Sequence, residues 1–123
     1  MKIYHKKDVL NVSKPEGINV VYYLLNEYGV HYNEQVPNSI QTWHHHAKSW
    51  ETLYVIAGEL LAKWRENGVE KSEILMSGDL VETERTPHTF INNSNKVAKF
   101  LVIKQILSGK DKRDILKTDK IID

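Results

Sequence analysis

The hydrophobic residues of this chain fall into short runs, most of which alternate with polar residues or are rich in Val, Ile and Tyr. Such runs are typical of β-strands, because successive side chains of a strand point to opposite faces of the sheet. The pattern predicts strands over residues 18–25, 52–57, 59–64, 69–76, 80–82, 88–92 and 97–107. Since no sustained helical period appears before residue 108, we expect an all-β fold.

Turn residues separate these runs at short intervals. Glu66-Asn67-Gly68 is a strong hairpin signal, because an Asn-Gly pair readily takes the positive φ values of a tight turn. Gly58 divides two apolar runs, Ser77-Gly78-Asp79 marks a further turn, and residues 93–96 form a polar stretch. Roughly eight to ten short strands at this spacing predict a sandwich or barrel.

The length of 123 residues suits one domain that buries a core without disulfides. Hydrophobic residues make up 41% and charged residues 27%, so a long disordered stretch is not expected. We expect a single domain over residues 1–123, with its core at about residues 17–107. The charged C-terminal segment 108–123 is predicted either to lie on the barrel or on a partner subunit, or to fray.

Charge and cysteine content exclude several function classes. The 17 Lys and Arg against 16 acidic residues give a net charge of +1. The chain therefore lacks the excess of positive charge that would predict binding to nucleic acid. The absence of cysteine excludes disulfides, thiolate metal sites and cysteine nucleophiles. Residues 1–7 lead into no apolar signal segment, and no apolar run reaches the length of a membrane span. We therefore expect a cytoplasmic protein without nucleic-acid or membrane partners.

Three histidines and a glutamate lie close together ahead of one predicted strand. On an extended strand His44 and His46 share one face while His45 points to the other, because strand side chains alternate. The chain can then turn back over residues 47–50 and bring Glu51 to the head of a neighbouring strand. His88 lies farther along the chain and is a candidate for a fourth ligand.

Three imidazoles and one carboxylate suit a borderline divalent ion such as Fe, Mn, Ni, Co, Cu or Zn. They do not suit Ca or Mg, which prefer oxygen ligands. A six-coordinate ion held by four protein ligands would keep two positions open for water, oxygen or a chelating substrate. The sequence therefore predicts one divalent transition metal ion as a cofactor.

The spacing of these residues resembles the first motif of the cupin superfamily. That motif carries His-x-His, four residues, Glu, six residues and Gly, and His44, His46, Glu51 and Gly58 match it at every position. Between Gly58 and Gly78 lie 19 residues, the short inter-motif segment typical of compact bacterial cupins.

The second cupin motif opens with Gly and ends in His, three residues and Asn, which corresponds here to Gly78, His88 and Asn92. Family members usually carry Pro-x-Gly ahead of the His. This chain instead reads Glu84-Arg85-Thr86-Pro87-His88, and its loop is one residue shorter. Asn92 at this motif position is expected to hold the turn that follows.

The resemblance implies a small barrel of two antiparallel sheets, with the metal ligands projecting inward beside a concave pocket for a small molecule. It also implies a homodimer, in which a strand of the partner covers an exposed sheet edge.

Three residues near His88 are candidates for the substrate pocket. Phe90 lies two residues beyond His88 and is expected to line the pocket. Glu82 and Arg85 lie just ahead of His88, where they are candidates for an acid/base group or an anchor for an anionic substrate. The alternative is that Glu82 and Arg85 lie in a loop exposed to water and have no role in a site. His31 has no identifiable partner in the sequence.

These features leave three functions open. The first is a metal-dependent enzyme of dioxygenase or isomerase type acting on a small organic molecule. The second is a module that binds or senses a small molecule without turnover. The third is a sugar-nucleotide epimerase or isomerase that works without metal, and the intact ligand set argues against it. The enzyme is favoured, although a fold by itself does not determine a function.

Overall fold

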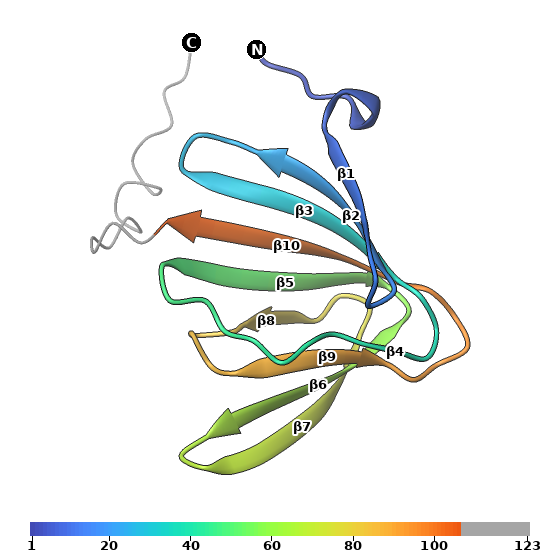
Figure 1. Cartoon of the computed structure of the whole chain (residues 1–123), viewed down its shortest axis with the longest axis vertical. Coiled ribbons are helices and arrows are strands. Elements are labelled where there is room, and N and C mark those ends of the chain that lie inside the picture. Colours follow the sequence, from blue (N-terminus) through green and yellow to red (C-terminus); the bar gives the residue numbers. More distant parts are fainter. Residues whose placement is uncertain (107–123) are drawn as a thin grey trace.

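The computed structural model describes residues 1–106, which form two antiparallel sheets facing each other as the walls of an open barrel (Figure 1). The larger sheet has the strand order β1 (Leu10–Lys14), β2 (Ile18–Leu24), β3 (Tyr28–Gln35), β10 (Ala98–Ile106), β5 (Ser49–Ala57) and β8 (Leu80–Glu82). The smaller sheet has the order β4 (Ser39–Ile40), β9 (His88–Asn92), β6 (Glu59–Glu66) and β7 (Val69–Met76). One turn of 3-10 helix, Lys6–Asp8, precedes β1.

The predicted all-β barrel is confirmed, and each strand predicted from alternation is present within residues 1–106. Three strands were not predicted, namely β1, β3 and β4. The inward face of β3 is buried but polar, because it carries His31, Asn33 and Gln35. The apolar residues Tyr28, Val30 and Tyr32 alternate on the other face of β3, so this spacing was a usable signal for the strand. The segment 108–123, for which we predicted a docked or frayed tail, lies outside the described residues.

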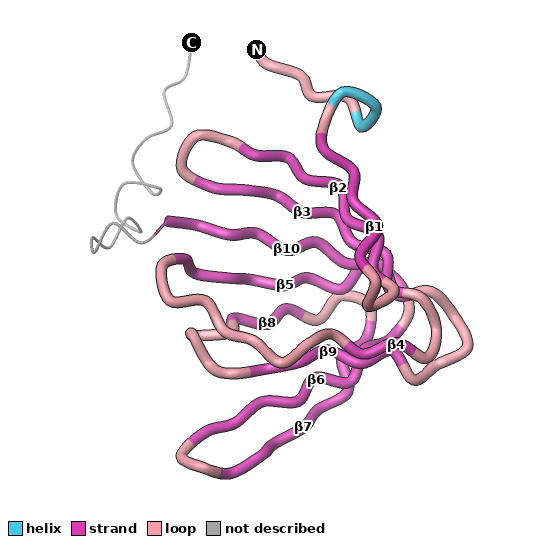
Figure 2. The backbone as a smooth tube through the Cα atoms, in the orientation of Figure 1, coloured by secondary structure: helices cyan, strands magenta, loops and turns pink. Residues whose placement is uncertain are grey.

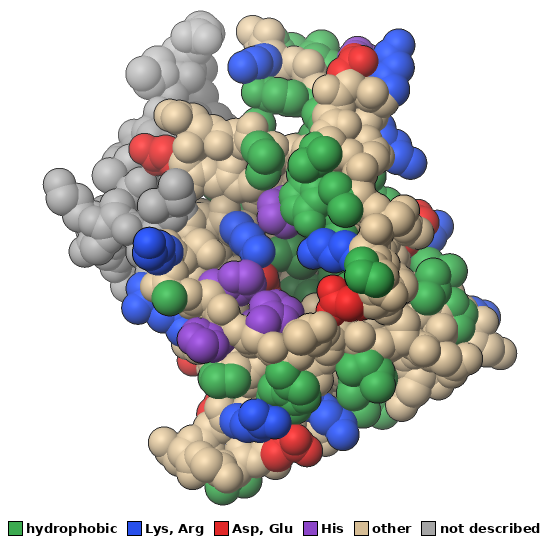
Figure 3. Space-filling view, viewed as in Figure 1, with side chains coloured by type: hydrophobic (Ala, Val, Ile, Leu, Met, Phe, Trp, Pro, Cys, Tyr) green, Lys and Arg blue, Asp and Glu red, His purple; other side chains and the backbone are tan. Residues whose placement is uncertain are grey.

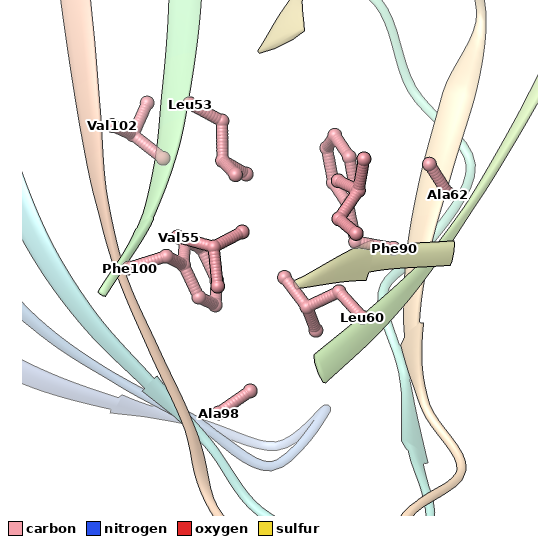
Figure 4. Packing of buried hydrophobic residues seen from close by; sticks show 9 residues of the cluster. Leu53, Val55, Leu60, Ala62, Phe90, Ala98, Phe100 and Val102 are labelled. Carbon is pink, nitrogen blue, oxygen red and sulfur yellow. The ribbon is translucent and has the colours of Figure 1, made fainter. Parts of the chain in front are cut away.

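The hydrophobic core lies between the two sheets. Figure 4 shows Leu53 and Val55 of β5 with Phe100 and Val102 of β10 on one side, facing Phe90 of β9. Burial of each large apolar side chain contributes about 1.5–3 kcal/mol to stability. This cluster therefore holds β5 and β10 against the smaller sheet.

A buried glutamine links the sheets at one end of the core. The Gln35 side chain is fully buried, and its Nε2 donates hydrogen bonds to the carbonyl oxygens of Ser39 at 3.2 Å and Phe90 at 3.1 Å. Its Oε1 accepts a hydrogen bond from Gln41 Nε2 at 3.1 Å. Because its polar atoms are paired, Gln35 is tolerated inside the barrel and connects β3 to β4 and β9.

The two turns that the sequence singles out most clearly form as expected. Asn67 and Gly68 have φ values of 51° and 76°, and they join β6 to β7 as a two-residue hairpin. Asn92 Nδ2 donates to the carbonyl oxygens of Gln35 and Lys96, while its Oδ1 accepts from the backbone N–H of Ser94. Asn92 thus holds the turn between β9 and β10.

Several edges and faces of the sheets remain open in the monomer. Large apolar side chains are exposed on β7, at Val69, Ile74 and Met76, and on β8, at Leu80. The homodimer remains a prediction. Within residues 1–106, no helix is both long and apolar enough to cross a membrane.

Gly58 lies in the left-handed region at φ 80°, and a Cβ there would approach the Val97 carbonyl oxygen to 2.8 Å. Gly68 has a similar φ of 76° but nothing within 4 Å. We expect Gly58→Ala to lower the free energy of unfolding by about 3 kcal/mol, and Gly68→Ala by only about 1 kcal/mol. Urea unfolding of both variants measures this difference, and equal losses would contradict the close approach at Gly58.

Candidate metal centre

The four predicted ligands come from an extended segment and from two strands in different sheets. His44 and His46 lie between β4 and β5, Glu51 is near the start of β5, and His88 begins β9. The expectation that His44 and His46 lie on a strand is wrong. This segment forms a single bridge with β9, in which His44 and His88 exchange backbone hydrogen bonds of 3.0 and 2.9 Å. Figure 2 shows it as a loop running beside β9.

The structure groups three of the predicted ligands, His44, His46 and Glu51, and the fourth, His88, contacts this group through Glu51. One ligand atom from each of His44, His46 and Glu51 lies within 4.8 Å of the others, a group that could hold a metal ion. Glu51 Oε2 is 2.8 Å from His46 Nε2, and Glu51 Oε1 is 3.2 Å from His88 Nε2. The ring centroids of His44 and His88 are 4.5 Å apart. His45 is exposed, as its place between the two ligands predicts.

Backbone carbonyls orient two of the imidazole rings. The Nδ1 atom of His44 is 2.6 Å from the Thr42 carbonyl oxygen, and that of His88 is 2.6 Å from the Thr86 carbonyl oxygen. Since a carbonyl oxygen only accepts, Nδ1 carries the proton and donates in both rings. The Nε2 atoms of the neutral rings are then free to act as metal ligands.

The chemistry of this cluster fits a cation. The Nε2 atoms of His46 and His88 are buried and form no well-aligned hydrogen bond, although Glu51 oxygens lie 2.8 and 3.2 Å away. In neutral His88 the Nε2 lone pair faces the Glu51 carboxylate, an arrangement that is repulsive unless a proton or a metal ion lies between them. A buried polar atom without a partner costs about 1–3 kcal/mol, and a metal ion bound by these donors would remove that cost.

Burial and charge act in opposite directions on these groups. Burial acts to raise the pKa of Glu51, but its contact with His88 and the charges of His46 and Lys104 hold that pKa below its usual value. Burial lowers the pKa of His46, and the attraction of Glu51 only partly opposes this shift. These shifts favour an ionised Glu51 carboxylate beside a neutral His46 imidazole, which are the protonation states that bind metal.

The cluster borders a cavity of about 260 Å³ on the inner side of the larger sheet. Figure 3 shows histidine side chains gathered around a hollow on this face, with basic and acidic side chains beside it. The predicted pocket residue Phe90 lines this cavity, together with Leu53 and Val102. His31 also lines it, with its ring centroid 4.6 Å from that of Tyr22.

The other two predicted pocket residues lie elsewhere. Glu82 is exposed and lines a second cavity of about 300 Å³, which borders the other side of His88 and Phe90 and includes Trp64. Arg85 is exposed and lines neither of these two cavities. The structure therefore separates Glu82 and Arg85 from the cavity that His44, His46 and Glu51 line.

Several residues of the cavity were not found from the sequence. Lys104 follows Phe100 and Val102 on the inward face of β10, so the alternation of this strand was a usable signal. His31 gave no such signal, because its neighbours on the inward face of β3 are polar. Lys14 and Glu16 reach the cavity from the β1–β2 region.

The loop ahead of His88 forms a tight turn without the glycine that the family usually has there. Glu84 and Arg85 both take positive φ values, of 50° and 62°, and the Thr86 N–H donates to the Thr83 carbonyl oxygen at 2.8 Å. Left-handed geometry costs a residue with a side chain about 1–2 kcal/mol. The Thr83 N–H donates to the Glu51 carbonyl oxygen at 3.1 Å, which anchors this turn beside the candidate ligand.

The model of the Cupin domain family matches residues 33–104, which is more than half of the chain. The chain therefore belongs to the cupin superfamily. The match includes both motifs and ends at Lys104. No curated protein matches the chain.

Solved structures share the fold at low sequence identity. An oxalate decarboxylase variant from Bacillus subtilis has a TM-score of 0.74 and 19% identity, over 85% of this chain and 29% of its own. The CENP-C cupin domain of Drosophila melanogaster has a TM-score of 0.69 and 22% identity, over 80% and 77% of the two chains. A sugar phosphate isomerase from Silicibacter pomeroyi has a TM-score of 0.66 and 17% identity, over 86% and 76%. This chain spans less than a third of the oxalate decarboxylase, and these likenesses establish the fold alone.

Burial lowers the pKa of His31 from 6.5 to about 4, with a further contribution from the Lys104 charge. Because the folded pKa lies below the unfolded one, the contribution of His31 to stability is present above pH 6.5 and is lost as the pH falls towards 4. We expect metal-free protein to lose about 2–3 kcal/mol more between pH 7 and pH 4.5 than the His31→Gln variant does. Urea unfolding at both pH values measures this.

The control for this experiment is His5→Gln, which changes an exposed histidine that does not line the cavity. It should keep the wild-type pH dependence. An equal pH dependence in the wild type and in His31→Gln would show that His31 is protonated as readily in the folded protein as in the unfolded chain.

Proposed function

We propose that His44, His46, Glu51 and His88 bind one divalent transition metal ion, and that the protein is a metal-dependent enzyme acting on a small organic molecule. The observation that carries this proposal is the position of the cluster. Its unpartnered imidazole nitrogens and its carboxylate converge beside a cavity rather than in a closed core. Metal sites with a purely structural role are closed by protein ligands, whereas catalytic sites keep an open position.

The residues of this chain have separable roles in the proposed site. His44 and His88 are held in the metal-binding tautomer by the Thr42 and Thr86 carbonyls. Phe90 forms an apolar part of the cavity wall and limits the access of water to a bound substrate. When bound, a divalent ion would polarise a carbonyl or hydroxyl group of the substrate, or bring substrate and oxygen together.

The proposal includes a dioxygenase and an isomerase version, and a binding module is the rival that uses the same cavity. Two of the structural relatives are described as an oxalate decarboxylase and a sugar phosphate isomerase. At 19% and 17% identity those activities do not carry over to this chain. The His–His–Glu group argues against the metal-free epimerase, because acid/base chemistry needs no such cluster.

We expect the wild-type protein to bind about one equivalent of divalent metal per chain, measured by metal analysis after purification and after loading. His46→Ala should lose most of this metal while the barrel stays folded, because His46 lies at the exposed end of the cluster. His45→Ala is the matched control, since it removes the neighbouring imidazole that faces solvent.

Wild-type protein that binds less than roughly a tenth of an equivalent, and takes up no more on loading, would rule out the metal site. If His46→Ala unfolds the barrel, the metal has a structural role instead. Circular dichroism of each variant distinguishes loss of the metal from loss of the fold.

Oxygen consumption separates the two enzyme versions. We expect Fe(II)-loaded protein to turn over a member of a panel of catechols, thiols, diketones and sugar derivatives, and His46→Ala to lose this activity at least 100-fold. Oxygen uptake that matches product formation identifies the dioxygenase. Product formation without oxygen uptake identifies the isomerase. Saturable binding of a panel member without any product would replace the enzyme with the binding module.

A further inference from the structure

A lysine points into the barrel where the strand pattern calls for an apolar residue. Phe100 and Val102 occupy the preceding inward positions of β10, and both are buried in the core. Lys104 continues this row and lines the cavity, with its Nζ atom 3.8 Å from Glu51 Oε2. Its side chain is only 31% exposed. Lysine side chains usually point to solvent, so an inward, partly buried lysine beside a candidate metal centre points to a ligand.

A second lysine reaches the same cavity from β1. Lys14 lines the cavity, and its Nζ atom lies 6.0 Å from the centroid of the Tyr22 ring. Its positive charge acts electrostatically on both Lys104 and His31. The cavity therefore contains two cationic groups that come from different strands of the larger sheet.

The acidic groups of the cavity already have partners. Glu51 belongs to the candidate metal centre, and Glu16 accepts a hydrogen bond from the Thr42 N–H. Within the described residues that line the cavity, two lysines therefore balance two glutamates. His31 adds no charge at neutral pH, because burial lowers its pKa to about 4. The residues that line the cavity therefore provide no further negative charge to balance a bound divalent ion.

A concave site with excess positive charge attracts anions, because its low-dielectric walls concentrate the electric field. The cavity of about 260 Å³ is below the range of about 300–1,000 Å³ found for drug-sized ligands, so the ligand is small. Neutral groups that can hydrogen-bond to it, Asn33, Gln41 and Tyr22, also line the cavity.

We propose that the cavity binds a small organic anion, whose carboxylate or phosphate group pairs with Lys104 and Lys14 while another of its oxygens faces the metal. This inference rests on the proposed metal centre and adds the substrate class to it. Lys104 and Lys14 are binding residues in this arrangement. Charge-assisted pairs of this kind are about twice as strong as neutral hydrogen bonds, and they select for charge as well as for size.

The test measures ligand binding by isothermal titration calorimetry on Zn²⁺-loaded full-length protein. The probes are glycolate, oxalate, inorganic phosphate and ethylene glycol, where ethylene glycol matches glycolate in size but carries no charge. We expect glycolate to bind at least 10-fold more tightly than ethylene glycol. Lys104→Met should weaken the binding of the anions by about 10- to 100-fold. Removal of the zinc from the wild-type protein should also weaken anion binding, because the ion supplies the excess positive charge.

Lys99→Met is the matched control, because Lys99 lies on the same strand with its side chain exposed to solvent. This variant should change the affinity for each anion less than twofold. If Lys104→Met does not fold, Lys14→Met should still weaken anion binding, and Lys104→Arg should retain most of it. Tighter binding of the carboxylates identifies a carboxylic acid, and tighter binding of phosphate identifies a phosphate ester; either result supports the proposal.

Equal affinities for glycolate and ethylene glycol, or unchanged anion binding in a folded Lys104→Met variant, would overturn the proposal. Metal binding is measured in parallel. It shows whether the anion proposal alone is wrong or whether the proposed metal centre is wrong as well. Lys104→Met should bind Zn²⁺ at least as tightly as the wild type, because it removes a positive charge 3.8 Å from Glu51. A wild type that takes up no metal would instead refute the proposed function.

Discussion

The Glu51 carboxylate lies against the Nε2 atoms of His46 and His88, and only 5% of the residue is accessible to solvent. A charge buried in this way costs several kcal/mol unless a partner compensates it. Lys104 is 3.8 Å away and provides only part of that compensation. His46, His88 and Lys104 all contact this one carboxylate. A bound cation would satisfy the carboxylate and the unpartnered nitrogens together.

The barrel divides into an apolar part and a polar part, and this division makes room for the site. Leu53, Val55 and Phe100 close the core between the sheets. The inward face of β3 is polar instead, and Gln35 compensates for its own burial by bonding to backbone on β4 and β9. His31 and Asn33 on the same face of β3 line the cavity.

Backbone hydrogen bonds position two of the histidines, His44 and His88. The mutual hydrogen bonds of His44 and His88 place two rings from distant parts of the sequence 4.5 Å apart. The left-handed turn at Glu84 and Arg85 leads the chain into His88 even though the usual glycine is missing. Thr83 stabilises this turn from both sides, because its carbonyl oxygen accepts from the Thr86 N–H and its own N–H donates to the Glu51 carbonyl oxygen.

The sequence by itself determined those features that have a local cause. Alternation predicted seven strand runs, the Asn67-Gly68 pair predicted the hairpin, and the ligand spacing predicted the cluster around Glu51. Only the tertiary structure decided that His31 lines the cavity and that Glu82 lies on another side of His88. The reason is physical: a polar side chain is stable inside a protein only if distant residues provide its partners, and no local pattern records where those partners lie.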